Sequence, residues 1–75
     1  MNKRKKAIYS GTFDPITNGH IDILQRALKV YDEVILGVAI SAAKEPMFNI
    51  NTRLMIIQEA IKNIKDVSAK PFDTL

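Results

Sequence analysis

Three apolar runs occur along this chain, at residues 7–9, 34–40 and 67–69. The first stops at Ser10 and Gly11, as a strand bounded by turn residues does. The second is continuously apolar rather than alternating, which is typical of a strand covered on both faces, as in a parallel sheet. We therefore expect three strands, the second of them buried on both sides.

Two helical stripes separate these runs. The first should begin near Asn18, a suitable N-cap, and consists of Ile21, Leu24, Leu28 and Tyr31. The second should begin near Asn49 or Asn51 and consists of Ile50, Leu54, Ile57, Ile61 and Ile64, with Arg53, Glu59 and Lys62 off the stripe. The order β-α-β-α-β predicts an α/β fold, a Rossmann-like parallel sheet with right-handed crossovers. Three strands and two helices are half of a doubly wound nucleotide-binding fold, so residues 1–75 are expected to be the N-terminal part of a single domain whose second half is absent.

Composition narrows the possible chemistry. The chain has no cysteine and one histidine, which excludes a disulfide framework and a zinc cluster. Much of the net charge of +3 lies in Lys3-Arg4-Lys5-Lys6. Because no second basic patch follows, we interpret this run as a solvated leader and expect no nucleic-acid partner. No stretch approaches a signal peptide or a membrane span, and we expect a cytoplasmic protein without a membrane partner.

The segment most informative about function runs from Ser10 to His20, between the first strand and the first helix. Open α/β sheets place their ligand crevice there. Gly11 allows a phosphate to approach the backbone, and free amides at a helix start favour an anion. His20 in the first helical turn can donate a hydrogen bond to a phosphate oxygen without a metal. Taken singly, each residue also has an ordinary structural explanation, and only their order and spacing favour a nucleotide site.

Gly11-Thr12-Phe13-Asp14-Pro15 followed by Thr17-Asn18-Gly19-His20 resembles the signature of the nucleotidylyltransferase superfamily. Threonine at the first position of the second element, where most members have histidine, is characteristic of phosphopantetheine adenylyltransferases. Lys44-Glu45-Pro46-Met47-Phe48 is similar to a second segment of that family. The resemblance implies transfer of an adenylyl group from ATP to 4'-phosphopantetheine, giving dephospho-coenzyme A and pyrophosphate, with Mg²⁺ as cofactor and no metal ligand among these residues. It also implies a homo-oligomer, a hexamer in the full-length family.

The same resemblance assigns roles to individual residues. It implies three catalytic residues: His20 as stabiliser of the transferring phosphate, Thr12 as orienter of the attacking phosphate and Lys44 as neutralising cation. It implies an ATP site formed by Ser10, Gly11, Thr12, Phe13, Gly19 and His20. It implies contacts with 4'-phosphopantetheine from Thr12, Lys44 and Leu75. Ser10 in place of proline, Glu45 in place of a lysine and Thr74 in place of an aspartate depart from the family pattern.

Two alternatives stay open at this point. One is a nucleotidylyltransferase for another acceptor, against which Thr17 and the segment 44–48 argue. The other is a non-catalytic nucleotide-binding fragment. Because the arginines and the triphosphate-binding motif of the family's second half have no counterpart in these residues, we expect the isolated chain to have little or no turnover.

Overall fold

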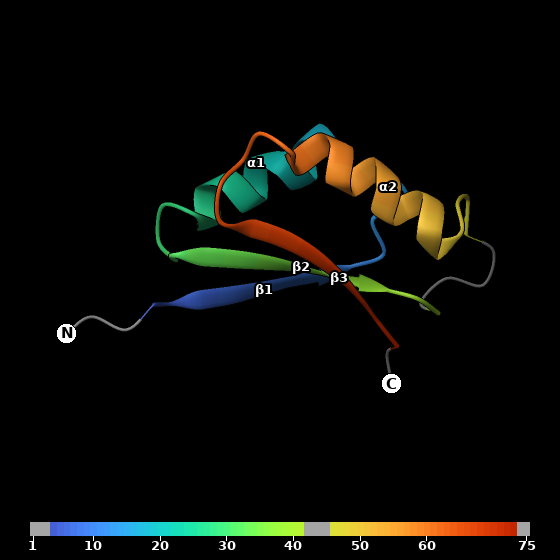
Figure 1. Ribbon diagram of the computed structural model, residues 1–75, viewed down its shortest axis with the longest axis horizontal. Helices are drawn as coiled ribbons and strands as arrows, with labels where there is room; N and C mark the ends of the chain where they lie inside the picture. Colours follow the sequence, from blue (N-terminus) through green and yellow to red (C-terminus); the bar gives the residue numbers. More distant parts are fainter. Residues whose placement is uncertain (1–3, 42–45, 74–75) are drawn as a thin grey trace.

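The computed structural model describes residues 4–41 and 46–73 and shows one parallel sheet with two helices (Figure 1). The elements in chain order are β1 (Lys6–Gly11), α1 (Asn18–Ala27), β2 (Glu33–Ala39), α2 (Ile50–Ile61) and β3 (Val67–Phe72). The strand order is β1-β2-β3, and both neighbouring pairs are parallel. The predicted α/β fold with order β-α-β-α-β is confirmed, and the first and third strands are longer than predicted.

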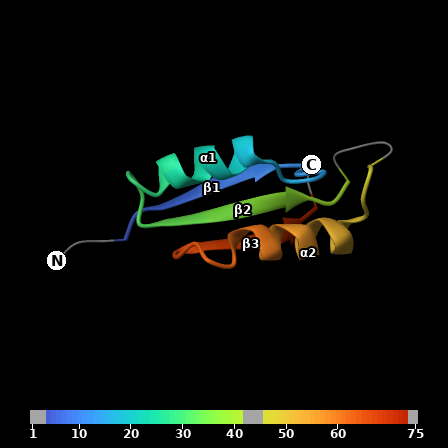
Figure 2. The same ribbon diagram turned by 90° about the horizontal axis from the view of Figure 1, so that it is seen from above.

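Both helices cover the same face of the sheet. Figure 1 shows α1 and α2 above the strands, and in Figure 2 α1 lies over the β1 side and α2 over the β3 side. Each right-handed crossover advances one strand in the same direction, so both place their helix on the same face. The expectation that the second strand is covered on both faces is therefore wrong for the described residues. On the opposite face Ile8 is 73% exposed, and the ring of Phe72 lies over Gly37.

The core lies between the sheet and the helices. Its fully buried members are Leu24 of α1, Ile57 of α2 and the three inward residues of β2, namely Val34, Leu36 and Val38. Successive side chains of a strand point to opposite faces, so these three valine and leucine side chains all meet the helices. Tyr31, predicted to be part of the first helical stripe, lies beyond the end of α1 and is 39% exposed.

The N-caps define where the two helices begin. Asn49 caps α2, because its side chain accepts from the amide of Thr52 at 2.8 Å. For α1 the predicted cap, Asn18, is wrong by one residue. Thr17 has the extended backbone of a cap, and its side chain accepts from the amide of His20. Asn18 is instead the first residue of the helix, although both residue types cap helices well.

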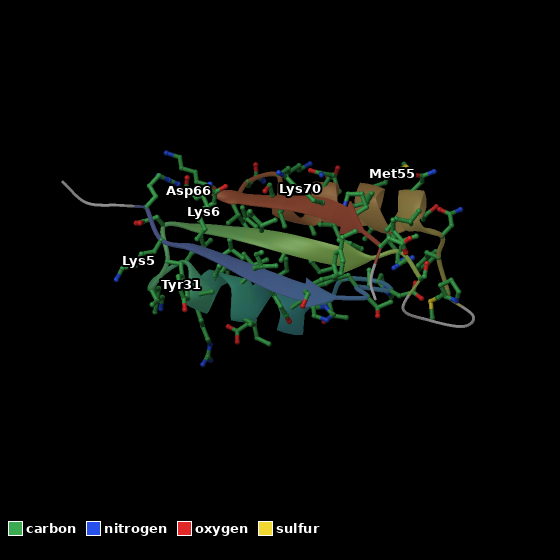
Figure 3. All side chains as sticks on the ribbon, turned by 90° about the horizontal axis from the view of Figure 1, so that it is seen from below. Lys5, Lys6, Tyr31, Met55, Asp66 and Lys70 are labelled. Atoms are coloured by element: carbon green, nitrogen blue, oxygen red, sulfur yellow. The ribbon has the colours of Figure 1, made fainter. Side chains whose placement is uncertain are left out.

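The described part of the basic leader lies at the amino ends of the strands. Arg4 is 3.6 Å from the carboxylate of Asp66 and 3.8 Å from that of Glu33. Figure 3 shows Lys5, Lys6 and Asp66 at this same end of the sheet. The pairs of Arg4 with Asp66 and Glu33 lie at the surface, where such pairs contribute at most about 1 kcal/mol each to stability. The charges of Arg4, Lys5 and Lys6 therefore lie away from the carboxyl ends of the strands. Within the described residues, neither helix is long and apolar enough to span a bilayer.

A core substitution tests this packing. We expect Leu24→Ala to lower the free energy of unfolding by about 2–5 kcal/mol, because a fully buried leucine leaves a cavity when truncated. Urea denaturation monitored by circular dichroism measures the change. Ile23→Ala is the control, since the neighbouring side chain is 52% exposed. Equal losses for the two variants would contradict the assignment of Leu24 to the core.

Candidate nucleotide site

The candidate site lies at the carboxyl ends of the parallel strands. Ser10 and Gly11 end β1 and pair with Gly37 and Val38 of β2, so the segments that follow these two strands begin side by side. Figure 2 shows both segments at the same end of the sheet. This is the edge at which open α/β sheets bind their ligands. The structure thus places Ser10, Gly11, Thr12 and Phe13 together at the edge where the prediction put a nucleotide.

His20 lies in the first turn of α1 and belongs to its capping box. The Thr17 amide donates to the Nδ1 atom of His20 at 2.9 Å, while the Thr17 side chain accepts from the His20 amide. The first two helical amides, those of Asn18 and Gly19, have no acceptor within the helix. There is no acidic side chain in this first turn. The start of α1 therefore offers amide donors and the positive end of a helix dipole to an anion.

An aromatic cluster connects β1 with the start of α1. The ring centroid of Phe13 is 4.8 Å from that of His20 and 5.2 Å from that of Tyr9, which it meets edge-on. Phe13 is 2% exposed and has a left-handed backbone, with φ of 49°. A left-handed phenylalanine is unusual, and the burial of its ring against two other rings offsets the cost of this conformation. Among the described residues, no backbone acceptor is found for the Phe13 amide.

Gly11 favours this packing because it leaves room for the Phe13 ring. A Cβ atom built at Gly11 would lie 3.2 Å from the Phe13 ring, closer than ordinary van der Waals contact. From the sequence alone, we expected the glycine here to let a phosphate approach the backbone. The structure adds a second reason for it, room for the ring that supports His20.

Asp14 joins the two segments that border the site. Its carboxylate accepts from the amides of Met47 and Phe48, at 2.5 and 2.8 Å. A carboxylate that accepts two backbone amides forms strong, charge-assisted hydrogen bonds. Asp14 thus attaches the segment before α2 to the segment after β1. This contact explains why an aspartate stands at position 14, within the signature. Because it joins residues more than thirty positions apart, no local sequence pattern indicates it.

Arg53 is the residue that the sequence analysis placed wrongly. It was expected off the apolar stripe of the second helix, yet it is 2% exposed. Its guanidinium donates to four main-chain carbonyls, those of Thr12, Ala39, Ile40 and Phe48, at 2.8 to 3.3 Å. Arg53 lies four residues before the buried Ile57, and this spacing indicates the same face of the helix. Its charge nevertheless led us to expect it off the apolar stripe. Arg53 therefore fixes the loop after β1, the end of β2 and the start of α2 against one another.

The predicted site residues are described in part. Ser10, Gly11, Thr12, Phe13, Gly19 and His20 lie on adjoining segments, and the rings of Phe13 and His20 are in contact. Lys44 and Leu75 lie outside the described residues.

The donor set does not fit a protein-held metal ion. Among the described residues, no three His, Asp or Glu side chains gather in one place, and the carboxylate of Asp14 is occupied by two amides. Mg²⁺ prefers oxygen ligands and is commonly held by substrate phosphates. No ligand for Mg²⁺ is therefore assigned to the described side chains.

Comparison with known proteins shows the family to which this chain belongs. Residues 8–75 match the family described as cytidylyltransferase-like. The chain belongs to this family. The match includes most of β1, the signature segment and both helices.

Relatives of this cytidylyltransferase-like chain carry a more specific name. It is 50% identical over 72 residues to the phosphopantetheine adenylyltransferase of Campylobacter concisus, and 46% identical to that of Campylobacter curvus. Each match covers 96% of this chain and 46% of the relative, so the chain spans about half the length of these curated relatives. The resemblance inferred from the two sequence segments is confirmed.

A solved structure confirms the Rossmann-like fold. The cytidylyltransferase-like chain superimposes with a TM-score of 0.76 on a bifunctional NMN adenylyltransferase/ADP ribose pyrophosphatase from Francisella tularensis, complexed with AMP and a manganese ion. The sequence identity is 18%, with 96% of this chain and 23% of that chain covered. At this identity the likeness concerns the fold alone.

Arg53 provides a test of how the site is held together. We expect Arg53→Met in the cytidylyltransferase-like chain to lower the free energy of unfolding by about 3 kcal/mol or more, because buried carbonyls lose their donor at a cost of about 1–3 kcal/mol each. Urea denaturation measures the loss. The control is Arg26→Met on α1, whose exposed pair with Asp22 contributes under about 1 kcal/mol. A loss below about 1 kcal/mol for Arg53→Met would contradict the role given to the buried guanidinium.

Proposed function

We propose that this chain carries the ATP-phosphate side of a phosphopantetheine adenylyltransferase site. In the proposed reaction a phosphate oxygen of 4'-phosphopantetheine attacks the α-phosphorus of ATP. The new P–O bond forms as the bond to the β-phosphate oxygen breaks, giving dephospho-coenzyme A and pyrophosphate. The observation that supports this most strongly is His20 in the first turn of α1, beside amides without internal acceptors, in a chain whose curated relatives bear this name.

This reaction needs the protein to position the two phosphates and to stabilise their charge, and it needs no nucleophilic side chain. The attacking group is already an anion, so no side chain has to remove a proton from it. Donors aimed at the transferring phosphate are what accelerate such a reaction. In the proposal His20 and the amide of Phe13 donate to ATP phosphate oxygens, with Ser10, Gly11 and Gly19 lining the nucleotide. Thr12 orients the acceptor phosphate.

The remaining parts of the proposal rest on the resemblance. Lys44 is proposed to neutralise the two phosphates, and Leu75 to border the pantetheine arm. Mg²⁺ is proposed to arrive with the phosphates of ATP, which supply its oxygen ligands. We also propose a cytoplasmic protein that assembles as a homo-oligomer, a hexamer as the family resemblance implies.

His20 is the residue with which to test the nucleotide site. We expect calorimetric titration of the chain with MgATP to show binding, and His20→Ala to weaken it at least about tenfold, since a hydrogen bond to a charged group contributes about 1.5–3 kcal/mol. Gln25→Ala, exposed on the same helix, should bind like the parent. Absence of ATP binding by the folded chain, or equal affinity of the parent and His20→Ala, would contradict the proposal.

The acceptor is tested separately. Titration with 4'-phosphopantetheine and with nicotinate mononucleotide compares the proposed acceptor with that of another nucleotidylyltransferase. Preference for 4'-phosphopantetheine supports the proposal. Preference for the mononucleotide would move the chain to another acceptor class while leaving its ATP site in place.

A further inference from the structure

The imidazole of His20 is held on its Nδ1 side by Thr17. The Thr17 amide nitrogen is 2.9 Å from Nδ1, and the Thr17 hydroxyl oxygen is 3.1 Å from it. A backbone amide donates a hydrogen bond and cannot accept one, so Nδ1 must be the accepting nitrogen. In a neutral imidazole the ring proton then lies on Nε2.

The ring has a second support from its aromatic neighbours. Phe13 is 4.8 Å from His20 between ring centroids, and Tyr9 is 6.1 Å away. Phe13 is itself held in place, because its side chain is buried and Gly11 leaves room for it. The capping contact fixes one ring nitrogen and the aromatic contacts restrict rotation of the ring. Nε2 is thus the nitrogen left for a ligand.

We propose that Thr17 is a positioning residue that holds His20 as the neutral tautomer protonated at Nε2, so that the histidine meets a phosphate oxygen as a hydrogen-bond donor. The identity of the ligand rests on the proposed function, whereas the tautomer rests on the capping contact alone. A donor at this place stabilises negative charge that grows on the phosphate oxygens during transfer. The accepting nitrogen of the ring is occupied by Thr17, so His20 has no free lone pair with which to act as a base.

Nitrogen NMR of the free chain tests the tautomer directly. The chain contains a single histidine, so its two ring nitrogens are assigned without ambiguity. We expect the resonance of an unprotonated nitrogen at Nδ1, that of a protonated nitrogen at Nε2, and a scalar coupling between the Thr17 amide nitrogen and Nδ1 across their hydrogen bond. A ring proton on Nδ1, or no coupling in a folded chain, would overturn the proposal.

Substitutions at Thr17 separate its hydroxyl from its amide. Thr17→Ser retains both groups and should leave the ring resonances and the coupling unchanged. Thr17→Val retains the amide but loses the cap oxygen, and we expect a smaller coupling. The control is Thr52→Val, the same substitution in the first turn of α2, where the amide of Thr52 donates to the N-cap Asn49. A coupling in Thr17→Val equal to that of the parent would show that the threonine side chain does not position the ring.

Two replacements of His20 test the donor role with ATP. The amide nitrogen of glutamine reaches near the place of Nε2, whereas that of asparagine reaches near the place of Nδ1. We expect His20→Gln to bind MgATP about tenfold more tightly than His20→Asn, the worth of one hydrogen bond to a charged group. Equal affinities, or tighter binding by His20→Asn, would overturn the donor role at Nε2. Failure of the parent chain to bind ATP would instead contradict the proposed function, since the tautomer is measured without nucleotide.

Discussion

The Arg53 guanidinium joins the three segments that meet at the carboxyl ends of the strands. It donates to the carbonyls of Thr12, Ala39, Ile40 and Phe48 and is almost wholly buried. Buried carbonyls need a donor, and these four lie in the loop after β1, at the end of β2 and just before α2. One planar side chain with several donors in fixed directions meets this need at once. The relative position of the loop after β1 and the start of α2 follows from that arrangement.

The site is built outward from this fixed base. Asp14 accepts from the amides of Met47 and Phe48, in the segment whose Phe48 carbonyl accepts from Arg53. With the loop after β1 held in this way, Phe13 takes its left-handed conformation and places its ring against those of Tyr9 and His20. The start of α1 then places a histidine and amides without helical acceptors beside the loop after β1. An arrangement held this firmly suits a reaction in which the protein positions anions and stabilises charge.

The apolar pattern was enough to predict the elements and their order, because each helix has an apolar stripe and each strand a short apolar run. It did not predict what covers them. The apolar run of β2 shows that its side chains avoid water, but the covering of each face depends on the path of the chain, and both described helices lie on one face. Arg53 was misplaced for a related reason. Its partners are 5 to 41 residues away, and hydropathy reports its charge but not its carbonyl acceptors.

The place of the signature segment between β1 and α1 was predicted correctly, since the strand, loop and helix that carry it are local features. Its supporting contacts were not, because Asp14 and Arg53 act across the fold. The choice of Asn18 as cap shows the same limit at short range. Thr17 and Asn18 are both good caps, and only the reciprocal contact with His20 decides between them.

The proposed ATP site at the carboxyl ends of the strands is tested most directly by mapping where ATP binds. The map comes from the backbone amide resonances of the nitrogen-labelled chain as MgATP is added. We expect the largest changes in amide resonance at two segments that meet at the carboxyl ends of the strands, namely Gly11, Thr12 and Phe13, and Asn18, Gly19 and His20. Changes centred instead on the uncovered face of the sheet, at Ile8, Ile35 and Lys70, would contradict the proposed site.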